Sequence, residues 1–151
     1  MIIGVPSEIK PQEYRVGLTP TSVQELTNHG HDVLIQDNAG FGAGFENQDY
    51  ISAGAKIAST AGDVFNDAEM IVKVKEPQKV EVEMLRENQL LFTYLHLSAA
   101  PELTKGLIKS KSICIAYETV TDEFNRLPLL APMSAVAGRM SIQAGAHSLE
   151  K

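Results

Sequence analysis

The sequence predicts an α/β domain with a mostly parallel, open sheet of about five strands and helices on both faces. Short β-branched runs alternate with amphipathic stretches along the chain, which is typical of βαβ units. Some runs, such as Leu90-Leu91-Phe92, are apolar at every position, as expected for strands that helices cover on both sides. The 151 residues are enough for about one domain with a substantial core.

Five strands are expected where β-branched and other apolar residues cluster. The first ends before Pro6, because proline has no N–H to donate to a strand ladder. The five strands are residues 2–5, 32–36, 68–74, 90–95 and 113–117.

Helices are expected between these strands. Thr19 before Pro20 predicts an N-cap followed by proline at the first helical position, and Gly30 predicts the left-handed end of that helix. The remaining helices are expected at residues 47–54 with Asn47 as the cap, at 59–66, at 80–87 and from Pro101 onward.

A last helix is expected from Pro132 through residues 133–149, which contain no further proline. Small residues recur in it and would let another backbone approach closely. We interpret it as a linking helix that packs against a surface outside this domain; the alternative is a surface helix of the same domain. The chain stops at Glu150 and Lys151 without a C-cap, so the sequence is expected to continue.

Composition and charge exclude several classes of protein. With 44% hydrophobic and 21% charged residues, the chain is neither disordered nor of low complexity. Its net charge of −6 argues against nucleic-acid binding. No apolar run reaches the roughly eighteen residues of a membrane span, and no secretory signal follows Met1. Because Cys114 is the single cysteine and cannot form an internal disulfide, a cytoplasmic location is expected.

Three cationic or titratable side chains follow predicted strands, where open parallel sheets bind their ligands. Arg15 offers a planar fork for a carboxylate. Lys75 can place an ammonium on a carbonyl or hydroxyl oxygen, and His96 can give and take a proton near neutral pH. The trio suits a small anion, and we expect it to converge on one pocket. The alternative is that these residues are ordinary surface charges and a satisfied core histidine.

Several segments resemble, in order along the chain, the N-terminal part of the alanine dehydrogenases and their relatives. Where the family usually has asparagine, this chain has Gln12, so a shifted hydrogen bond is expected in that loop. The similar segments are Gly4-Val5-Pro6-Ser7-Glu8, residues 13–20, residues 38–45 with Tyr50 and residues 53–55, residues 72–77 around Lys75, residues 91–97 around His96, and residues 129–134 through Gly138.

The resemblance implies a role for each matching residue. Arg15 would hold the carboxylate of pyruvate or alanine, and Lys75 would bind near the keto oxygen or amino nitrogen. His96 would be the catalytic acid and base. Met133 would help wall the substrate pocket, and Ser134 would contact the nicotinamide end of NAD.

The resemblance also implies the organisation of the whole enzyme. Residues 1–131 would be a flavodoxin-like or Rossmann-like substrate domain and residues 132–151 the start of an interdomain helix. An NAD-binding domain, which supplies a further aspartate in the family, would lie outside this chain. The implied reaction is the reversible oxidative deamination of L-alanine to pyruvate and ammonia by a homo-oligomer, a hexamer at full length. This chain alone is expected to be inactive.

A glycine-rich turn at residues 40–45 invites comparison with a dinucleotide fingerprint. Its spacing is G-x-G-x-G, and the sixth position is Phe45 where that fingerprint has glycine or alanine. We therefore expect these glycines to serve turn geometry. His29 and His31 have no further ligand nearby, so no metal site is expected, and Cys114 is expected to be a packing residue.

Two other functions remain open. The first is the N-terminal domain of a nicotinamide nucleotide transhydrogenase subunit, which belongs to the same superfamily and resembles the N-terminal domain of the dehydrogenases. The presence of His96 together with Lys75 favours the dehydrogenase. The second is a non-catalytic binding or assembly module, with no nucleic-acid or membrane partner.

Overall fold

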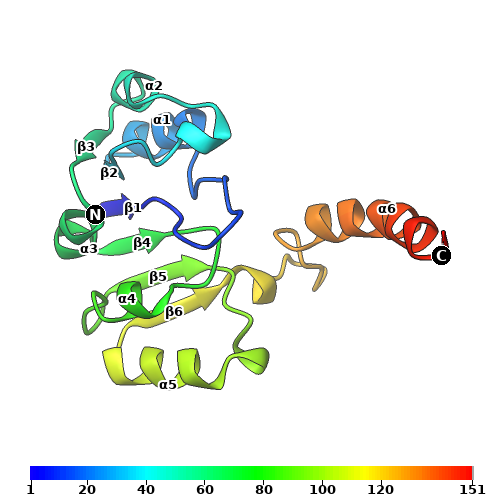
Figure 1. The fold of residues 1–151 in the computed structure, drawn as a ribbon. Coiled ribbons are helices and arrows are strands. Elements are labelled where there is room, and N and C mark those ends of the chain that lie inside the picture. The colour runs from blue at the N-terminus through cyan, green and yellow to red at the C-terminus, as the bar shows by residue number, and fades with distance from the viewer. Residues whose placement is uncertain (151) are drawn as a thin grey trace. The chain divides into compact units, whose positions relative to one another are not determined.

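The computed structural model describes residues 1–150, which form two compact units (Figure 1). The first unit comprises residues 1–116 and holds the whole sheet, and the second begins at Tyr117. Each unit has its own internal contacts and is described separately.

The first unit is built on a sheet of six parallel strands, so the predicted mostly parallel α/β fold is confirmed. The strand that the sequence did not reveal is β3, whose three residues are too few to show a pattern. In spatial order the strands are β3 (Lys56–Ala58), β2 (Asp32–Gln36), β1 (Ile2–Val5), β4 (Met70–Val72), β5 (Leu90–Thr93) and β6 (Ile113–Ala116).

Helices and short 3-10 turns connect the strands. The predicted helix at residues 80–87 is shorter in the structure: α4 is a single turn that ends at Val82, and turns at residues 83–84 and 87–88 lead to β5. The connecting elements are α1 (Pro20–Asn28), η1 (Phe41–Ala43), α2 (Asn47–Ser52), α3 (Ala61–Asp67), α4 (Lys79–Val82), η2 (Leu97–Ala99) and α5 (Pro101–Ser110).

The helix ends follow local chemistry. Thr19 caps α1 by accepting a hydrogen bond from the Ser22 N–H, and Gly30 takes the predicted left-handed conformation. The prediction that Asn47 caps α2 is wrong. Glu46 is the cap and exchanges hydrogen bonds with the turn that follows it, whereas the Asn47 side chain bonds back to Asn38 and the preceding loop.

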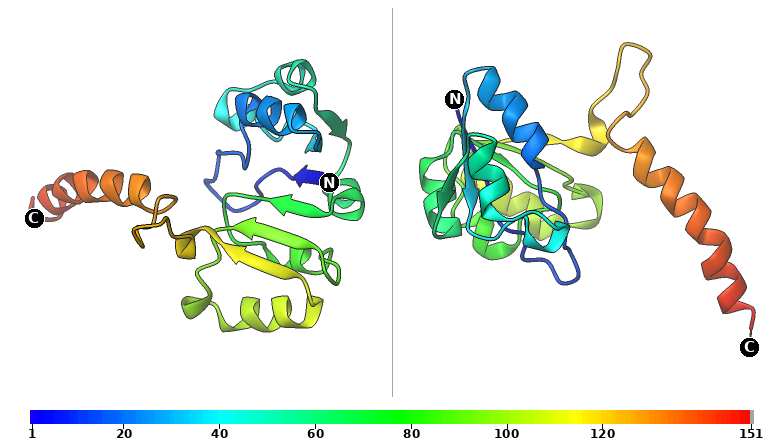
Figure 2. Two further views of the ribbon diagram at one scale, coloured as in Figure 1. Left: turned by 180° about the vertical axis from the view of Figure 1, so that it is seen from behind. Right: turned by 90° about the horizontal axis from the view of Figure 1, so that it is seen from above.

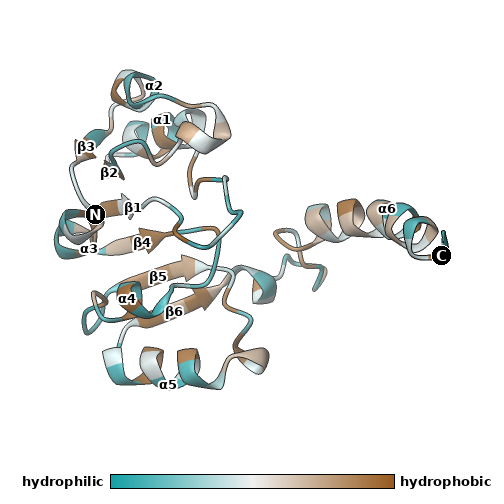
Figure 3. Cartoon of the chain, in the orientation of Figure 1, coloured by the Kyte–Doolittle hydropathy of each residue, from teal (hydrophilic) through white to brown (hydrophobic). Residues whose placement is uncertain are grey.

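Helices cover both faces of the sheet, as predicted (Figure 2). On one face, Val5 and Ile35 pack with Val23 of α1 and with residues of α2. On the other face, Ile71 and Leu91 pack with residues of α3 and α5. Figure 3 shows the resulting pattern, with hydrophobic strands and helices of mixed hydropathy. Coverage is incomplete at the edge strand β6, where Ile113 is 48% exposed and Ile115 41% exposed.

The second unit contains η3 (Tyr117–Thr119) and α6 (Ala131–Ser148). The predicted helix from Pro132 onward is therefore confirmed, with Leu130 at its N-cap. None of the residues of α6 is buried, and the apolar side chains of Ile142 within it and of Leu149 just after it are largely exposed. Among residues 1–150, no helix is both long and apolar enough to cross a membrane. The proposed domain boundary at residues 131 and 132 stays a prediction.

Candidate functional site

The strand order places a candidate site at one point on the sheet edge. In a doubly wound sheet, the helices change face between the two central strands, here β1 and β4, and ligands bind beyond the carboxyl ends of these strands. The loop after β1 carries Arg15, and the segment after β4 carries Lys75. His96 follows the neighbouring strand β5.

Arg15 is held by a carboxylate from its own loop. Glu13 accepts from the Arg15 Nε at 2.8 Å, from its Nη2 at 2.6 Å and from its backbone N–H at 2.9 Å. These hydrogen bonds, together with the charges of Arg15 and Lys75, lower the pKa of Glu13 to about 2 against the opposing effect of burial. Glu13 in turn raises the pKa of Arg15, so the guanidinium stays charged. The Glu13 pair fixes one edge of the guanidinium and so sets its direction.

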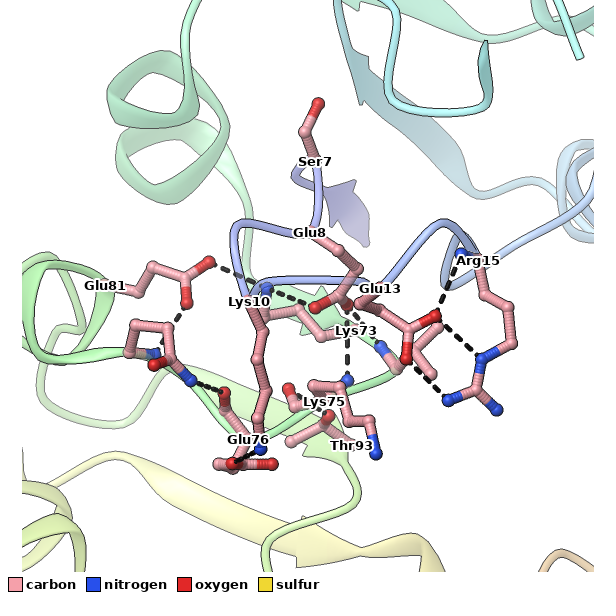
Figure 4. A network of polar contacts seen from close by, with 12 residues as sticks. Ser7, Glu8, Lys10, Glu13, Arg15, Lys73, Lys75, Glu76, Glu81 and Thr93 are labelled. Carbon is pink, nitrogen blue, oxygen red and sulfur yellow. Dashed lines mark hydrogen bonds and ion pairs between the residues drawn. The ribbon is translucent and has the colours of Figure 1, made fainter. Parts of the chain in front are cut away.

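Lys75 is fixed through its main chain. The Glu8 carboxylate accepts from the backbone N–H of Val74 at 2.6 Å and from that of Lys75 at 3.3 Å. On the other side, the Thr93 hydroxyl donates to the Lys75 carbonyl at 2.8 Å. Figure 4 shows the Lys75 ammonium and the Arg15 guanidinium on the same side of this network.

A buried ion cluster supports the Lys75 segment from behind. Lys73 is completely buried and donates to Glu81 Oε1 at 2.7 Å and to Glu8 Oε2 at 3.2 Å. Glu81 also accepts from the Gln78 backbone N–H at 2.7 Å, which begins α4. Every atom of the cluster that carries charge has a partner of opposite charge or a backbone donor, as burial requires.

A second ion pair joins the same two loops nearer the surface. Lys10 donates to Glu76, the residue after Lys75. Burial raises the pKa of Glu76, but the hydrogen bonds from Lys10 and from the backbone, together with the charges of Lys10 and Lys75, outweigh burial, and the pKa is lowered. The loop after β1 is therefore bound to the segment after β4 at two points, through Glu8 and through Lys10.

His96 has an uncommon backbone conformation. Its φ of 51° and ψ of 38° lie in the left-handed region, which non-glycine residues adopt only rarely and often at functional sites. Its ring stacks on Tyr94, with centroids 6.2 Å apart and an angle of 11° between the planes. Tyr94 also contributes, after Glu13, to the raised pKa of Arg15.

The structure thus brings the predicted trio to one edge of the sheet. Arg15 and Lys75 both lower the pKa of the Glu13 carboxyl group, and the His96 ring stacks on Tyr94 at the end of the next strand. In such an arrangement the two cations can bind a small molecule that carries a carboxylate, and the imidazole can exchange a proton with another group of that molecule. The roles of the three residues remain predictions.

The glycines of the turn at residues 40–45 each have a structural reason, close packing at two positions and backbone conformation at the third. A Cβ on Gly40 would lie 2.6 Å from the Tyr50 ring, and one on Gly42 would lie 3.0 Å from the Tyr14 carbonyl oxygen. Gly44 has a φ of +85°. Other residues of the protein fill the space beside Gly40 and Gly42, and Gly44 supplies the positive φ, which fits the predicted turn.

Met133 and Ser134 lie on α6 in the second unit, and the Ser134 hydroxyl donates to the Leu130 carbonyl at 3.3 Å. Their proposed contacts with substrate and nicotinamide remain predictions. No cluster of three metal-ligating side chains occurs within residues 1–150. Cys114 packs beside the core cluster that contains Leu91, in agreement with its predicted packing role.

A groove of about 910 Å³ lies between α4 and α5. Val82 and Leu103 form part of its wall, with lysines and glutamates of both helices around them. None of Arg15, Lys75 and His96 lines it. The groove therefore does not hold the predicted trio, although Glu76, the residue after Lys75, is part of its wall.

Four residues of the site were not found by sequence reasoning: Glu8, Glu13, Lys73 and Thr93. All lie in or beside segments that carry the resemblance, but nothing in a sequence distinguishes a solvated glutamate from one that holds a neighbouring loop. Gln12 has a φ of 65°, a left-handed conformation that asparagine adopts more readily than glutamine. The shifted hydrogen bond expected there stays a prediction.

Comparison with known proteins agrees with the resemblance. A family model described as "Alanine dehydrogenase/PNT, N-terminal domain" matches residues 4–137. An alanine dehydrogenase of Halomonas elongata is 58% identical over 151 residues, which are the whole of this chain and 41% of that relative. One of Bacillus subtilis is 55% identical over 151 residues, 39% of its length. The chain thus spans about two fifths of the length of these curated relatives.

The chain is also similar to two kinds of solved structure. An L-alanine dehydrogenase superposes with a TM-score of 0.90 at 55% identity, covering 99% of this chain and 41% of that one. A transhydrogenase from Sinorhizobium meliloti superposes with a TM-score of 0.74 at 28% identity, covering 78% of this chain and 34% of that one. The dehydrogenase is the more similar of the two by both measures.

Proposed function

The chain belongs to the alanine dehydrogenase/PNT N-terminal domain family, and from this premise we propose that it is the substrate domain of an NAD-dependent L-alanine dehydrogenase. Such an enzyme interconverts L-alanine with pyruvate and ammonia. In this proposal, residues 1–131 form the substrate domain and residues 132–151 begin an interdomain helix. The observation that carries the proposal is the placement of Arg15 and Lys75 on two loops bound to each other where the helices change face.

The proposed roles follow from the chemistry of each group. Arg15 binds the substrate carboxylate through its guanidinium group. Lys75 directs its ammonium toward the keto oxygen of pyruvate or the amino nitrogen of alanine. His96 gives and takes the proton at that centre. Met133 walls the pocket.

The turn at residues 40–45 does not fit a grip on the NAD pyrophosphate, because Tyr50 and Tyr14 close the spaces beside Gly40 and Gly42. NAD would supply the hydride acceptor when bound. We therefore propose that the part of the enzyme outside this chain holds NAD, with Ser134 alone contacting its nicotinamide end. We also expect the complete enzyme to be a cytoplasmic homo-oligomer, and sedimentation of the complete enzyme should show a hexamer.

A chimera tests the proposal directly. This chain replaces the matching segment of the Bacillus subtilis alanine dehydrogenase, to which it is 55% identical over 151 residues. The chimera should form NADH from L-alanine, whereas the purified chain alone should not. A folded chimera without alanine-dependent NADH formation would contradict the proposal and favour a binding or assembly module.

Replacing His96 identifies the acid and base within the same chimera. His96→Ala should lower kcat by about 10²–10⁴-fold while changing pyruvate binding by less than about 10-fold. The reason is that a group that transfers a proton stabilises the transition state and contributes little to binding of the ground state. His29→Ala, on an exposed histidine at the end of α1, is the matched control and should leave both constants unchanged. Equal losses of kcat and of pyruvate affinity in His96→Ala would assign His96 to binding.

A further inference from the structure

Thr93 is the only polar side chain of β5, the strand that leads to His96. It is completely buried, with its hydroxyl hydrogen-bonded to the Lys75 carbonyl at 2.8 Å. A buried hydroxyl needs a partner, and here the partner is a residue of the candidate site. The contact therefore links the strand before His96 to the segment that presents Lys75 (Figure 4).

The two segments are joined beyond the ends of their strands. The Lys73 N–H donates to the Phe92 carbonyl at 3.1 Å, and the Tyr94 N–H donates to the Val74 carbonyl at 3.3 Å. The strand β4 itself ends at Val72, so this pairing continues past it. Thr93 adds the next bond in the same direction, with a side-chain hydroxyl in place of a backbone N–H.

The peptide groups of Lys75 are thus held from two sides. Glu8, from the loop that also carries Arg15, accepts from the Lys75 N–H at 3.3 Å. Thr93, from the strand that leads to His96, donates to the Lys75 carbonyl at 2.8 Å. The main chain of Lys75 is therefore bound both to the loop that carries Arg15 and to the strand that leads to His96.

We propose that Thr93 is a positioning residue that sets the place of the Lys75 ammonium relative to His96, an inference that rests on the proposed dehydrogenase function. Thr93 does not itself contact the substrate. Its hydroxyl acts through the main chain of Lys75, and a displacement of about 1 Å at a binding group can cost about 100-fold in rate.

The test uses the chimera with L-alanine and NAD, and it begins with Thr93→Val, which keeps the shape of the side chain and removes the hydroxyl. We expect kcat/KM to fall by about 10–100-fold, while a folded protein with a similar melting temperature remains. Thr93→Ser, which retains the hydroxyl, should restore kcat/KM to within about 3-fold of the unmodified chimera.

Thr27→Val is the matched control. The Thr27 hydroxyl also donates to a backbone carbonyl of another element, that of Ala53 at 3.0 Å, but outside the site. It should leave kcat/KM unchanged. If Thr93→Val lowers only the melting temperature, as Thr27→Val can, the role of Thr93 is structural and the proposal is overturned.

A double-substitution cycle decides whether Thr93 acts through Lys75. In a Lys75→Ala background, Thr93→Val should change kcat/KM by less than about 2-fold, because the group that it positions is gone. An undiminished effect in that background overturns the proposal. An unmodified chimera that does not oxidise L-alanine, or a Lys75→Ala variant with unchanged kcat/KM, counts instead against the proposed function.

Discussion

The carboxyl edge of the sheet and helix α6 are opposite kinds of structure within one chain. At the edge, Lys73 and Glu81 are buried as charges, and Lys75 is held by hydrogen bonds from two other segments. Along α6, none of the eighteen residues is buried, and apolar side chains such as Met140, 59% exposed, face solvent.

The difference shows which proposed roles the chain supports by its own contacts. Arg15 and Lys75 have their surroundings within residues 1–116, so their geometry is a property of that unit. Ser134 lies on a helix without buried residues and bonds only within its own turn among the hydrogen bonds described. Substitutions should therefore have large effects at the edge and small effects in α6.

The largest effect on stability is expected from removing the buried ammonium. Lys73→Met leaves the Glu8 and Glu81 carboxylates buried and facing each other, and it should lower the free energy of unfolding by about 3–5 kcal/mol. Lys56→Met, which breaks an exposed pair with Asp32, is the control and should cost less than about 1 kcal/mol. Urea denaturation of this chain measures both. Equal costs would remove the contrast between buried and exposed charges.

The pair of Glu13 with Arg15 should give the edge an acid-sensitive contribution. Because the folded-state pKa of Glu13 is about 2, below its usual 4.5, the contribution is complete above about pH 5 and is lost as the pH falls toward 2. Glu13→Gln should thus lower the free energy of unfolding at pH 7 by about 1 kcal/mol, a modest value because Arg15 is half exposed. The deficit should shrink at pH 2.5.

Denaturation of both proteins at the two pH values measures this difference. Glu102→Gln is the control, since Glu102 and its partner Lys105 on α5 are both exposed to solvent. A Glu13→Gln deficit that stays constant between pH 7 and pH 2.5 would show that the charge of Glu13 is not its cause.

A smaller, stabilising effect is expected in the loop that carries Arg15. Gln12→Asn should raise the free energy of unfolding by about 0.5 kcal/mol, because asparagine tolerates the left-handed conformation better. The same change at Gln24, inside α1, should lower it by a few tenths of a kcal/mol, since asparagine is the poorer helix former. Thermal unfolding of the two variants shows whether the signs differ, as expected.

The smallest effect is expected in α6. Met140→Ala should change the free energy of unfolding of this chain by less than about 0.5 kcal/mol, because its side chain is 59% exposed. Leu91→Ala, at a completely buried position in β5, should cost about 2–5 kcal/mol. A large cost at Met140 would mean that α6 is buried in solution, for example by association. Sedimentation of the unmodified chain and of Met140→Ala would then show whether the chain associates and whether the substitution weakens the association.

The sequence by itself determined the class of fold and the candidate trio. The alternation of strands and helices, the Thr19 cap and the Gly30 terminus depend on residues close together in the chain, so their signals are local. Arg15, Lys75 and His96 could be selected because each follows an apolar run that reads as a strand. The short strand β3, the true cap of α2 and the early end of α4 were missed, because short segments carry weak patterns.

Only the tertiary structure decided where the site lies and what holds it. The strand order places β1 beside β4, and residues separated by 65 to 67 positions then meet in the Glu8 contacts with Lys73, Val74 and Lys75. A glutamate or threonine has the same appearance in a sequence whether water or a buried partner satisfies it. Its role is set by desolvation and by neighbours distant along the chain, which exist only once the sheet has formed.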